Sequence, residues 1–571
     1  MKKKKILLIA FIYLACPFVI KAQQYGVIID ELMADPSPQI GLPNHEWVEL
    51  KNTTLLPINL SGWKIGDAGS SSGPMPNFIL QPDSFVIVCG TSAIAAMSGL
   101  GTAIAVTSFP SLDNNGDVVS LKDNEGRTIH AVAYTIEWYD NALKKDGGWS
   151  LEMIDTNNPC TGGNNWKASI SNSGGTPGKK NSVNAINNDQ LSPRLQRAWA
   201  IDNLTIVLLF NEPVDSLKAA VSSNYSLDNG LTILAASTIG PVFDKVQLKL
   251  GMPMQPNTVY IVTANNVTDC KNNVIVGFNN VKVGMPGDAA PDDMIVNEIL
   301  FNPRANAYDY VEFYNNSDKI LDASHLYVAN RNTNHAINSI TPLSAIPWLV
   351  FPGEYVVVTE EAASLLREYL VKNSDWVLSL SSLPSFPDDE GYVLLLNYQG
   401  EILDEVDYRD DWHFKLIADA EGVALERIDP NKPSQDADNW HSAGSTAGYG
   451  TPSYKNSQSK QLPGIGANIE LTPKIFSPDN DGLDDIATIQ YKVYEPGYVA
   501  NITIFDATGR PVRNLVRNGI LALSGYWNWD GLDDRGRKLP VGPYVIFTEL
   551  FNLQGKKVSF KNAIVLARKY Q

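Results

Sequence analysis

The chain has 571 residues, with 45 Lys and Arg against 62 Asp and Glu, so its formal net charge at pH 7 is −17. Such an acidic chain repels phosphate backbones, which argues against nucleic acid as a partner and suits calcium binding or solubility better. Its length predicts roughly three to five domains. The 42 glycines and 34 prolines lie between short Val, Ile and Tyr runs, a pattern typical of all-β domains.

The first 22 residues have the pattern of a secretory signal peptide. Lys2 to Lys5 form a basic start, Ile6 to Ile20 is mostly apolar, and Ala22 offers a small-residue cleavage point. The apolar run is shorter than the about 20 residues that a spanning helix needs, and no later stretch approaches that length. An alternative is a lipoprotein signal that uses Cys16. Cleavage near Ala22 removes five lysines and leaves 40 basic and 62 acidic residues, a net charge of −22.

Residues 23–186 and 290–458, called copy 1 and copy 2 here, repeat the same phrases in the same order, which indicates a duplicated domain. Short alternating runs closed by turn residues predict a β-sandwich for each copy. The paired phrases are VIIDELMADP (27–36) with MIVNEILFNP (294–303), EWVELKN (46–52) with DYVEFYNN (309–316), FILQPDSFVIVC (78–89) with WLVFPGEYVVVT (348–359), and SLEMIDTNNPCTGGNNW (150–166) with ALERIDPNKPSQDADNW (424–440).

Three acids occupy equivalent positions in the two copies. Carboxylates on neighbouring strands suit acid–base catalysis when their environments separate their pKa values. No nucleophile, metal-ligand set or positioning arginine accompanies them in both copies, so we predict that they satisfy backbone donors and pair locally. The pairs are Glu31 with Glu298, Glu49 with Glu312, and Glu152 with Glu426.

Aromatic and histidine positions carry weaker signals. The pairs Trp138/Trp412 and Trp166/Trp440 could form a platform for a sugar ring, but we favour core packing. The histidines have no H-E-x-x-H or other metal-ligand spacing, and no role is shared between the copies, so we predict solvated or hydrogen-bonded side chains. They are His45, His130, His325, His335, His413 and His441.

The two copies resemble the lamin tail domain, an immunoglobulin-like fold found in nuclear lamins and in secreted bacterial proteins. The resemblance rests on the N-E-I-L-x-N-P type opening, on W/Y-V-E-L/F-x-N, and on a closing L-E-x-I-D…N-W…T-P phrase. Copy 2 departs from it at His325-Leu326, where copy 1 has Ser61-Gly62-Trp63. The resemblance implies two Ig-like sandwiches.

The segment 190–287 is similar to the bacterial Ig-like modules of surface-layer and adhesin proteins. It carries the strand-F-x-E-P-V phrase in NLTIVLLFNEPVD (203–215) and the closing V-T-D-x-x-x-N phrase in TVYIVTANNVTDCKNN (258–273). The resemblance implies a spacer.

The segment 467–571 resembles the C-terminal sorting domains of Bacteroidetes-type proteins exported by the type IX secretion system, and also the Ig-like domain of flagellar hook-capping proteins. The matching phrases are KIFSPDNDGLDD (474–485), DATGR (506–510) and WDG (529–531), whereas Pro543 replaces the usual small residue or valine. The resemblance implies that the secretion machinery is a partner. The segment would then serve outer-membrane export or attachment; the alternative is one more Ig-like spacer.

One loop in this last segment is a candidate calcium site. Asp479, Asp481, Asp484 and Asp485 fall within the phrase SPDNDGLDD, and Gly482 permits a tight bend. Calcium takes about six to eight oxygen ligands, which such a loop supplies in part. The alternative is a cluster of Asx turns that ends a strand. No other cofactor is predicted.

Three cysteines follow the signal peptide, namely Cys89, Cys160 and Cys270. Copy 2 lacks the first two together, with Thr359 and Ser434 in their places. One hypothesis is therefore a disulfide between Cys89 and Cys160 in an oxidising compartment. The interpretation we favour is two separate, small buried thiols.

These patterns predict an all-β protein, a string of Ig-like β-sandwich domains that is exported to the cell surface or the extracellular space. We expect a non-catalytic role in adhesion, presentation or scaffolding, with an unknown surface protein or glycan as partner. The alternatives are a glycan-binding protein, or an extracellular hydrolase with its site in the copy 2 insert, Asn330 to Pro352.

Overall fold

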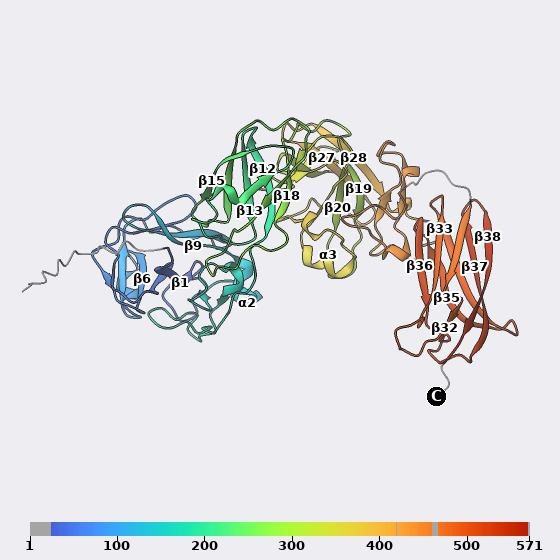
Figure 1. The fold of residues 1–571 in the computed structure, drawn as a ribbon, viewed down its shortest axis with the longest axis horizontal. Helices are drawn as coiled ribbons and strands as arrows, with labels where there is room; N and C mark the ends of the chain where they lie inside the picture. Colours follow the sequence, from blue (N-terminus) through green and yellow to red (C-terminus); the bar gives the residue numbers. More distant parts are fainter. Residues whose placement is uncertain (1–23, 418, 460–465, 569–571) are drawn as a thin grey trace, which may run out of the picture. The chain divides into compact units, whose positions relative to one another are not determined.

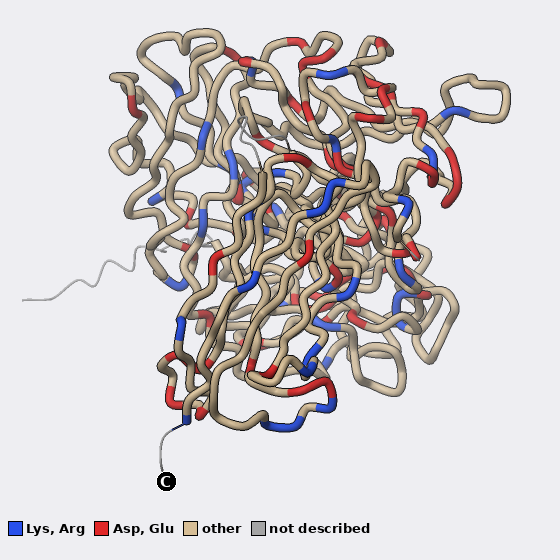
Figure 2. The backbone as a smooth tube through the Cα atoms, turned by 90° about the vertical axis from the view of Figure 1, so that its right-hand side faces the viewer, with Lys and Arg blue, Asp and Glu red and all other residues tan. Residues whose placement is uncertain are grey.

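The computed structural model describes residues 24–417, 419–459 and 466–568, and these form mostly β-strands (Figure 1). The predicted signal peptide lies outside the described residues. Acidic positions are scattered along the tube (Figure 2). Within the described part of the chain, no helix is long and apolar enough to cross a membrane. The all-β string of β-sandwiches predicted from the sequence is confirmed.

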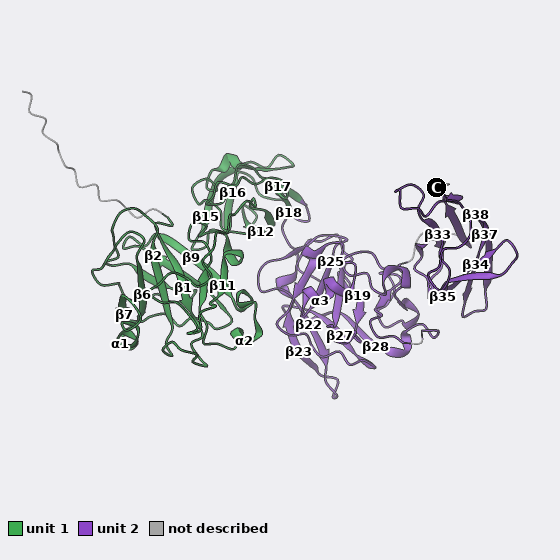
Figure 3. Cartoon of the chain, turned by 90° about the horizontal axis from the view of Figure 1, so that it is seen from below, with its two compact units in different colours: residues 1–254, 260–283 green, residues 255–259, 284–571 purple. Residues whose placement is uncertain are grey.

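The chain divides into two compact units (Figure 3). Unit 1 contains residues 1–254 and 260–283, and unit 2 contains residues 255–259 and 284–571. Every sheet is built from strands of only one of the four sequence segments described above. Unit 1 therefore holds the strands of copy 1 and of segment 190–287, and unit 2 holds those of copy 2 and of segment 467–571.

Copy 1 packs a six-stranded sheet, in the order β11-β10-β1-β2-β6-β7, against a three-stranded sheet β4-β8-β9 and the short pair β3-β5. Strand β1 is buried at every position because it runs through the middle of the larger sheet. The elements are β1 (Val27–Met33), β2 (Trp47–Asn52), β3 (Ile58–Asn59), β4 (Lys64–Gly66), β5 (Ile79–Leu80), β6 (Phe85–Gly90), α1 (Ile94–Met97), β7 (Ala103–Val106), β8 (Gly116–Lys122), β9 (Thr128–Thr135), α2 (Ala142–Lys145), β10 (Leu151–Met153) and β11 (Trp166–Ala168).

Copy 2 repeats this topology and adds one strand to its second sheet. Its larger sheet has the order β30-β29-β19-β20-β25-β26, and a parallel last pair closes both larger sheets. Its elements are β19 (Met294–Leu300), β20 (Tyr310–Asn315), β21 (Leu321–Asp322), β22 (Leu326–Arg331), β23 (Ile337–Pro342), β24 (Leu349–Val350), β25 (Tyr355–Thr359), α3 (Ala362–Glu368), β26 (Val377–Ser379), β27 (Glu390–Asn397), β28 (Ile402–Arg409), β29 (Leu425–Arg427) and β30 (Trp440–Ser442).

The copy 2 insert forms regular structure. Strand β23 pairs with β22 as an additional edge strand, with Tyr327 opposite Pro342 and Arg331 opposite Ile337. The Arg331 guanidinium pairs with Glu405 on β28 (2.6 Å), two strands away across the same sheet. The insert therefore extends the second sheet of copy 2.

The other two segments are also two-sheet structures. Segment 190–287 packs the sheet β12-β13-β16-β15 with β14-β17-β18, and segment 467–571 packs β31-β33-β36 with β32-β38-β37-β34-β35. The strands are β12 (Leu195–Asp202), β13 (Thr205–Phe210), β14 (Tyr225–Leu227), β15 (Ile233–Ile239), β16 (Lys245–Leu250), β17 (Tyr260–Ala264), β18 (Asn280–Val283), β31 (Ala467–Thr472), β32 (Ile475–Phe476), β33 (Ala487–Val493), β34 (Tyr498–Asp506), β35 (Pro511–Ile520), β36 (Ser524–Trp529), β37 (Gly542–Asn552) and β38 (Lys557–Leu566).

Candidate functional site

The three acids shared by the copies form a row across each larger sheet. In copy 1, Glu31 on β1 lies opposite Glu152 on β10 and opposite Glu49 on β2. In copy 2 the same register places Glu298 between its two counterparts, Glu426 and Glu312. All six side chains are fully buried. Each row is therefore a line of neighbouring carboxyl groups inside a sandwich.

A closing loop, residues 175–183 in copy 1, supplies hydrogen-bond donors to the row. Glu31 accepts the backbone N–H of Thr176 (2.7 Å), and Glu49 accepts that of Gly178. Glu152 accepts the Thr176 hydroxyl (3.0 Å) and the Val183 N–H (3.0 Å). The row thus holds the last segment of copy 1 on the face of the sheet.

The closing loop of copy 2, residues 450–458, is held in the same way. Glu298 accepts the N–H of Thr451 (2.8 Å), and Glu312 accepts that of Ser453 (2.5 Å). Glu426 accepts the N–H of Gln458 (2.8 Å) and the Ser457 hydroxyl (2.8 Å). The prediction that the shared acids satisfy backbone donors is confirmed.

Burial and mutual repulsion raise the pKa values of these carboxyl groups. Desolvation, and then the neighbouring Glu152, raise the pKa of Glu31 to about 8. Desolvation, and then Glu31, raise that of Glu49 to about 10, and Glu298 rises to about 8 for the equivalent reasons. Raised pKa values are common at catalytic sites. Here the oxygens already accept loop donors, so the arrangement is suited to holding the loop.

The copies differ in how they cap a β-bulge in their first strand. The register of β1 shifts between Ile29 and Glu31, and that of β19 shifts between Val296 and Glu298. In copy 1 the free N–H of Ile29 donates to His130 Nδ1 (2.9 Å), while His130 Nε2 contacts the Pro159 carbonyl (3.0 Å). Desolvation lowers the pKa of His130 to about 4, so this imidazole is neutral.

In copy 2 an ion pair replaces that histidine. The N–H of Val296 donates to Asp404 Oδ2 (2.8 Å), and Arg427 donates to the same oxygen (3.0 Å) and to the Val296 carbonyl (2.7 Å). The Arg427 and Asp404 side chains are only 1% and 6% exposed. The equivalent of Arg427 in copy 1 is the apolar Met153. The histidine and the ion pair are therefore two solutions to one capping problem.

The hypothesis of a Cys89–Cys160 disulfide is wrong. Cys160 is bonded to Cys270, with their Cα atoms 6.1 Å apart, so the bridge joins copy 1 to segment 190–287. Cys89 is a free, buried thiol that packs with Trp47 and Met97, and burial raises its pKa to about 11. The favoured interpretation of two unbridged thiols is correct for Cys89 and wrong for Cys160.

The aspartate loop of segment 467–571 brings together three of its four candidate ligands. Oxygens of Asp479, Asp481 and Asp485 lie within 4.8 Å of one another, and Asp484 is outside the group with φ of 53°. Asp485 also accepts backbone N–H groups of Asp479 (3.1 Å), Asn480 (2.6 Å) and Gly482 (2.8 Å). Asp481 Oδ1 accepts the N–H of Leu483 (2.9 Å), which is an Asx turn, so the loop geometry agrees with both interpretations given above.

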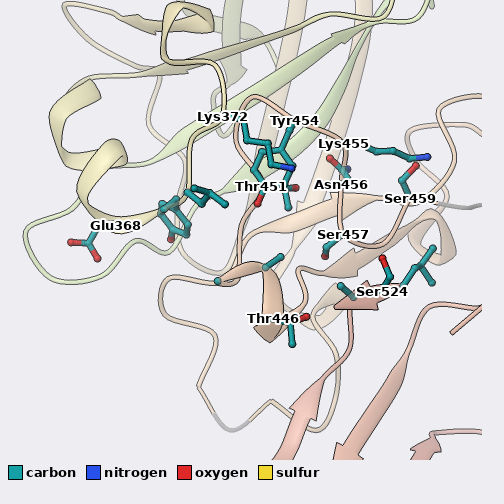
Figure 4. A pocket seen from close by; sticks show the side chains of 16 residues that line it. Glu368, Lys372, Thr446, Thr451, Tyr454, Lys455, Asn456, Ser457, Ser459 and Ser524 are labelled. Carbon is teal, nitrogen blue, oxygen red and sulfur yellow. The ribbon is translucent and has the colours of Figure 1, made fainter. Parts of the chain in front are cut away.

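A pocket of about 630 Å³ lies between copy 2 and segment 467–571 (Figure 4). Its wall includes the copy 2 closing loop, and Lys372 Nζ lies 4.0 Å from the centre of the Tyr454 ring. The hydroxyls of Thr451 and Ser457 are occupied by the glutamate row, and Thr446 bonds the Tyr491 hydroxyl (2.5 Å). These hydroxyl groups therefore hold the closing loop and the contact between copy 2 and segment 467–571.

A second pocket has a volume of about 510 Å³, and its lining includes two histidines to which the sequence assigned no functional role. Trp412, His413 and His441 line it together with acids such as Asp411 and Asp438. Both imidazoles are largely buried, and their Nε2 atoms have no hydrogen-bond partner. Desolvation, and then His441, lower the pKa of His413 to about 4. The pocket combines an aromatic ring with polar groups.

The tryptophan pairs pack as the favoured interpretation predicts. Trp412 and Trp440 have ring centres 6.3 Å apart at 27°, and Trp138 and Trp166 lie 6.1 Å apart at 30°. Trp166 and Trp440 are buried in the copy 1 and copy 2 cores, and their partners pack against those cores half-buried. Core packing is confirmed for both pairs, while Trp412 also lines the second pocket.

Comparison with known proteins identifies part of copy 1. The sequence model of the Lamin Tail Domain family matches residues 21–135, which confirms the resemblance for that part of the chain. A search of curated proteins found no match.

Three solved structures are similar to this chain at low sequence identity. A DUF4876 family protein from Bacteroides thetaiotaomicron is 13% identical, with a TM-score of 0.19, over 36% of this chain and 83% of that one. Latent PorU from Porphyromonas gingivalis is 10% identical, with a TM-score of 0.15, over 71% and 35%. The N-terminal part of the bacterial S-layer protein SbsC is 14% identical, with a TM-score of 0.15, over 29% of this chain and only 40% of that one. All three TM-scores lie below 0.2, so these similarities are distant.

Proposed function

We propose that this chain is an exported, non-catalytic β-protein that acts in adhesion, presentation or scaffolding at the cell surface or outside the cell. In this proposal copy 1 and copy 2 are both lamin tail domains, segment 190–287 is an Ig-like spacer, and segment 467–571 is a sorting or attachment domain. The observation that carries the proposal is the Cys160–Cys270 disulfide, since such bonds persist in oxidising compartments.

The use of the buried glutamates supports a structural role for the duplicated domain. In both copies the same three carboxyl groups hold the closing loop, which a domain reused as a building block needs in every copy. The disulfide supports a mechanical role as well, because it ties copy 1 covalently to the following segment. A surface protein that carries load or spans distance gains from such a joint.

The test is whether residues 467–571 deliver the protein across the outer membrane. Deleting residues 467–571 should leave the rest of the chain in the periplasm, and placing those residues behind a signal peptide and a reporter should bring the reporter outside. The matched control is the fusion carrying segment 190–287 instead, which has the same all-β character and should stay inside. Normal surface delivery of the truncated chain would reject the sorting role and leave an attachment or spacer role.

A second candidate function is glycan binding, favoured by the pocket beside Trp412. An indole ring beside imidazole, carboxylate and ammonium groups offers both a stacking face and hydrogen bonds to a sugar ring. In a glycan screen with the full chain, Trp412→Ala should lose a signal that Trp138→Ala, its copy 1 counterpart, retains. Equal signals from both variants would reject the Trp412 pocket as a glycan site.

A further inference from the structure

A second acidic group lies in unit 1, away from the aspartate loop. Asp189 lies ahead of β12, Glu212 follows β13, and Asp269 follows β17 beside Cys270. One carboxylate oxygen from each lies within 4.8 Å of the other two. Glu212 and Asp269 are buried and Asp189 is half-buried. Three residues far apart in sequence thus converge next to the disulfide.

The central acid of this group is uncompensated. Glu212 is only 8% exposed, and its Oε1 atom has no hydrogen-bond partner. Desolvation, and then the charges of Asp189 and Asp269, raise its pKa to about 8. A buried acceptor left without a donor costs about 1–3 kcal/mol, and more when it is charged. A cation bound among the three acids would give this oxygen the partner that it lacks.

The two other carboxylates are held in fixed positions. Asp269 Oδ1 accepts the N–H groups of Lys271 (2.8 Å) and Asn273 (2.9 Å), and its Oδ2 accepts Asn273 Nδ2 (2.7 Å). Asp189 Oδ1 accepts the N–H of Leu191 (3.0 Å). A carboxylate has about four lone-pair sites, so each retains capacity for a further ligand. The group is therefore preorganised.

Two basic side chains of this region are directed to other partners. The Arg194 guanidinium lies over the Phe278 ring (4.7 Å), and Lys271 Nζ donates to the Asn157 carbonyl (3.1 Å). Arg194 lowers the pKa of Glu212, but by less than burial and the two acids raise it. The protein's own cations thus leave the charge of the group largely unbalanced.

We propose that Asp189, Glu212 and Asp269 bind one calcium ion. Oxygens that share a calcium ion at about 2.3–2.6 Å lie no more than about 5 Å apart, which the observed spacing satisfies. Magnesium demands near-ideal octahedral geometry at about 2.0–2.1 Å and keeps several of its waters, so calcium suits a set of protein oxygens better. Backbone carbonyls and water complete the shell.

The position of the ion gives it a mechanical role. The Asp189 carboxylate also accepts the Thr161 hydroxyl of copy 1 (3.2 Å), one residue after Cys160, while Asp269 precedes Cys270. The ion and the disulfide would therefore close the same joint between copy 1 and segment 190–287. Calcium outside the cell would then stiffen a joint that remains looser before export.

The test is calcium titration of the full chain by calorimetry, in chelator-treated buffer and in an Asp485→Asn background that disables the aspartate loop. The background protein should bind one calcium ion and gain thermal stability from it. Adding Glu212→Gln should weaken binding at least tenfold, whereas Asp244→Asn, a half-buried acid of the same segment paired with Lys245, should leave it unchanged. Melting in EDTA should be the same or higher for Glu212→Gln, because a buried acid has been removed.

The proposal is overturned if the background protein binds no calcium at millimolar concentration, or if Glu212→Gln binds as the background does. Magnesium bound as tightly as calcium would overturn the assignment to calcium. If Glu212→Gln does not fold, Asp189→Asn decides the question, because Asp189 is half-buried and precedes the first strand of its segment. Unchanged binding by that variant also overturns the proposal.

Discussion

Replacing Asp30 with asparagine should stabilise the closing loop of copy 1. Copy 2 has Asn297 at this position, and its amide donates to Glu312 Oε1 (2.7 Å) and to Asn456 Oδ1 (2.6 Å). In copy 1 the corresponding atoms, Glu49 Oε1 and Asn181 Oδ1, are buried without a partner, as is Asp30 Oδ1. Asp30→Asn supplies the two missing donors.

The magnitude follows from the proton that Asp30 holds. Desolvation raises its pKa from 3.8 to about 7, so between these values the folded state keeps a proton that the unfolded state has released. The stability that this proton contributes is fully present below pH 3.8 and is lost as the pH rises through about 7. The loss is at most about 4 kcal/mol. Asparagine has no such loss. We expect a gain of about 1–3 kcal/mol at pH 8, the cost of an unsatisfied buried group, and a smaller gain at pH 5.

Hydrogen exchange measured by mass spectrometry reads this gain locally, which matters because a multidomain chain does not unfold in one step. Peptides covering residues 175–183 should exchange about 5- to 150-fold more slowly in Asp30→Asn at pH 8, while peptides covering 450–458 stay unchanged. The reciprocal variant Asn297→Asp should accelerate exchange in copy 2 only. Faster exchange in the Asp30→Asn loop, or a difference that does not grow with pH, would refute the reasoning.

Three further predictions follow from the same structure. Arg427→Met should destabilise copy 2 by about 3–5 kcal/mol in denaturant unfolding, because it leaves Asp404 charged and buried. The double variant Asp404→His/Arg427→Met has the two residues of copy 1 and should recover much of that loss. Additive losses would contradict the equivalence of the histidine and the ion pair as caps. The Cys160–Cys270 bridge spans 110 residues, so its loss should lower the free energy of unfolding of unit 1 by about 2–5 kcal/mol and leave unit 2 unaffected. The bridge is removed by reduction or by replacing both cysteines with serine. Unchanged stability would mean that the bridge does not constrain the joint between copy 1 and segment 190–287. Cys89 should resist iodoacetamide at pH 8 until the protein is unfolded, because it is buried and its pKa is raised, and rapid labelling of the native protein would show that copy 1 opens at β6.

The repeated phrases predicted the fold well because they carry the contacts that both copies need. Glu31, Glu49 and Glu152 recur in copy 2 because each holds a backbone donor of the closing loop, and the loop recurs with them. A comparison of two copies within one chain thus locates residues whose role is internal to the domain.

The same comparison failed for the cysteines for a physical reason. The partner of Cys160 is Cys270, which lies outside the repeat, so the alignment of the two copies could not point to it. Ser434, the counterpart of Cys160, instead bonds the Asp404 carboxylate (2.5 Å), and Thr359, the counterpart of Cys89, bonds the Asp309 carbonyl (2.9 Å). Copy 2 therefore lacks both cysteines because each replacing side chain makes its own local hydrogen bond, and not because a shared bridge is missing.

The burial of His413 and His441 could not be predicted from copy 2 alone. The wall of their pocket includes Gly497 and Leu553 of the last segment, so their environment depends on a packing arrangement between segments. The group of Asp189, Glu212 and Asp269 is hidden from sequence inspection in the same way, since a connecting segment and two strand ends bring it together.

The most direct test of the account is mass spectrometry of the native protein, unreduced and recovered by fractionation of the cells that make it. The account predicts recovery from the surface or medium fraction, a mature N-terminus near Gln23, and a cross-linked peptide pair containing Cys160 and Cys270. Recovery from the cytosolic fraction, with the first 22 residues present and both cysteines reduced, would contradict it.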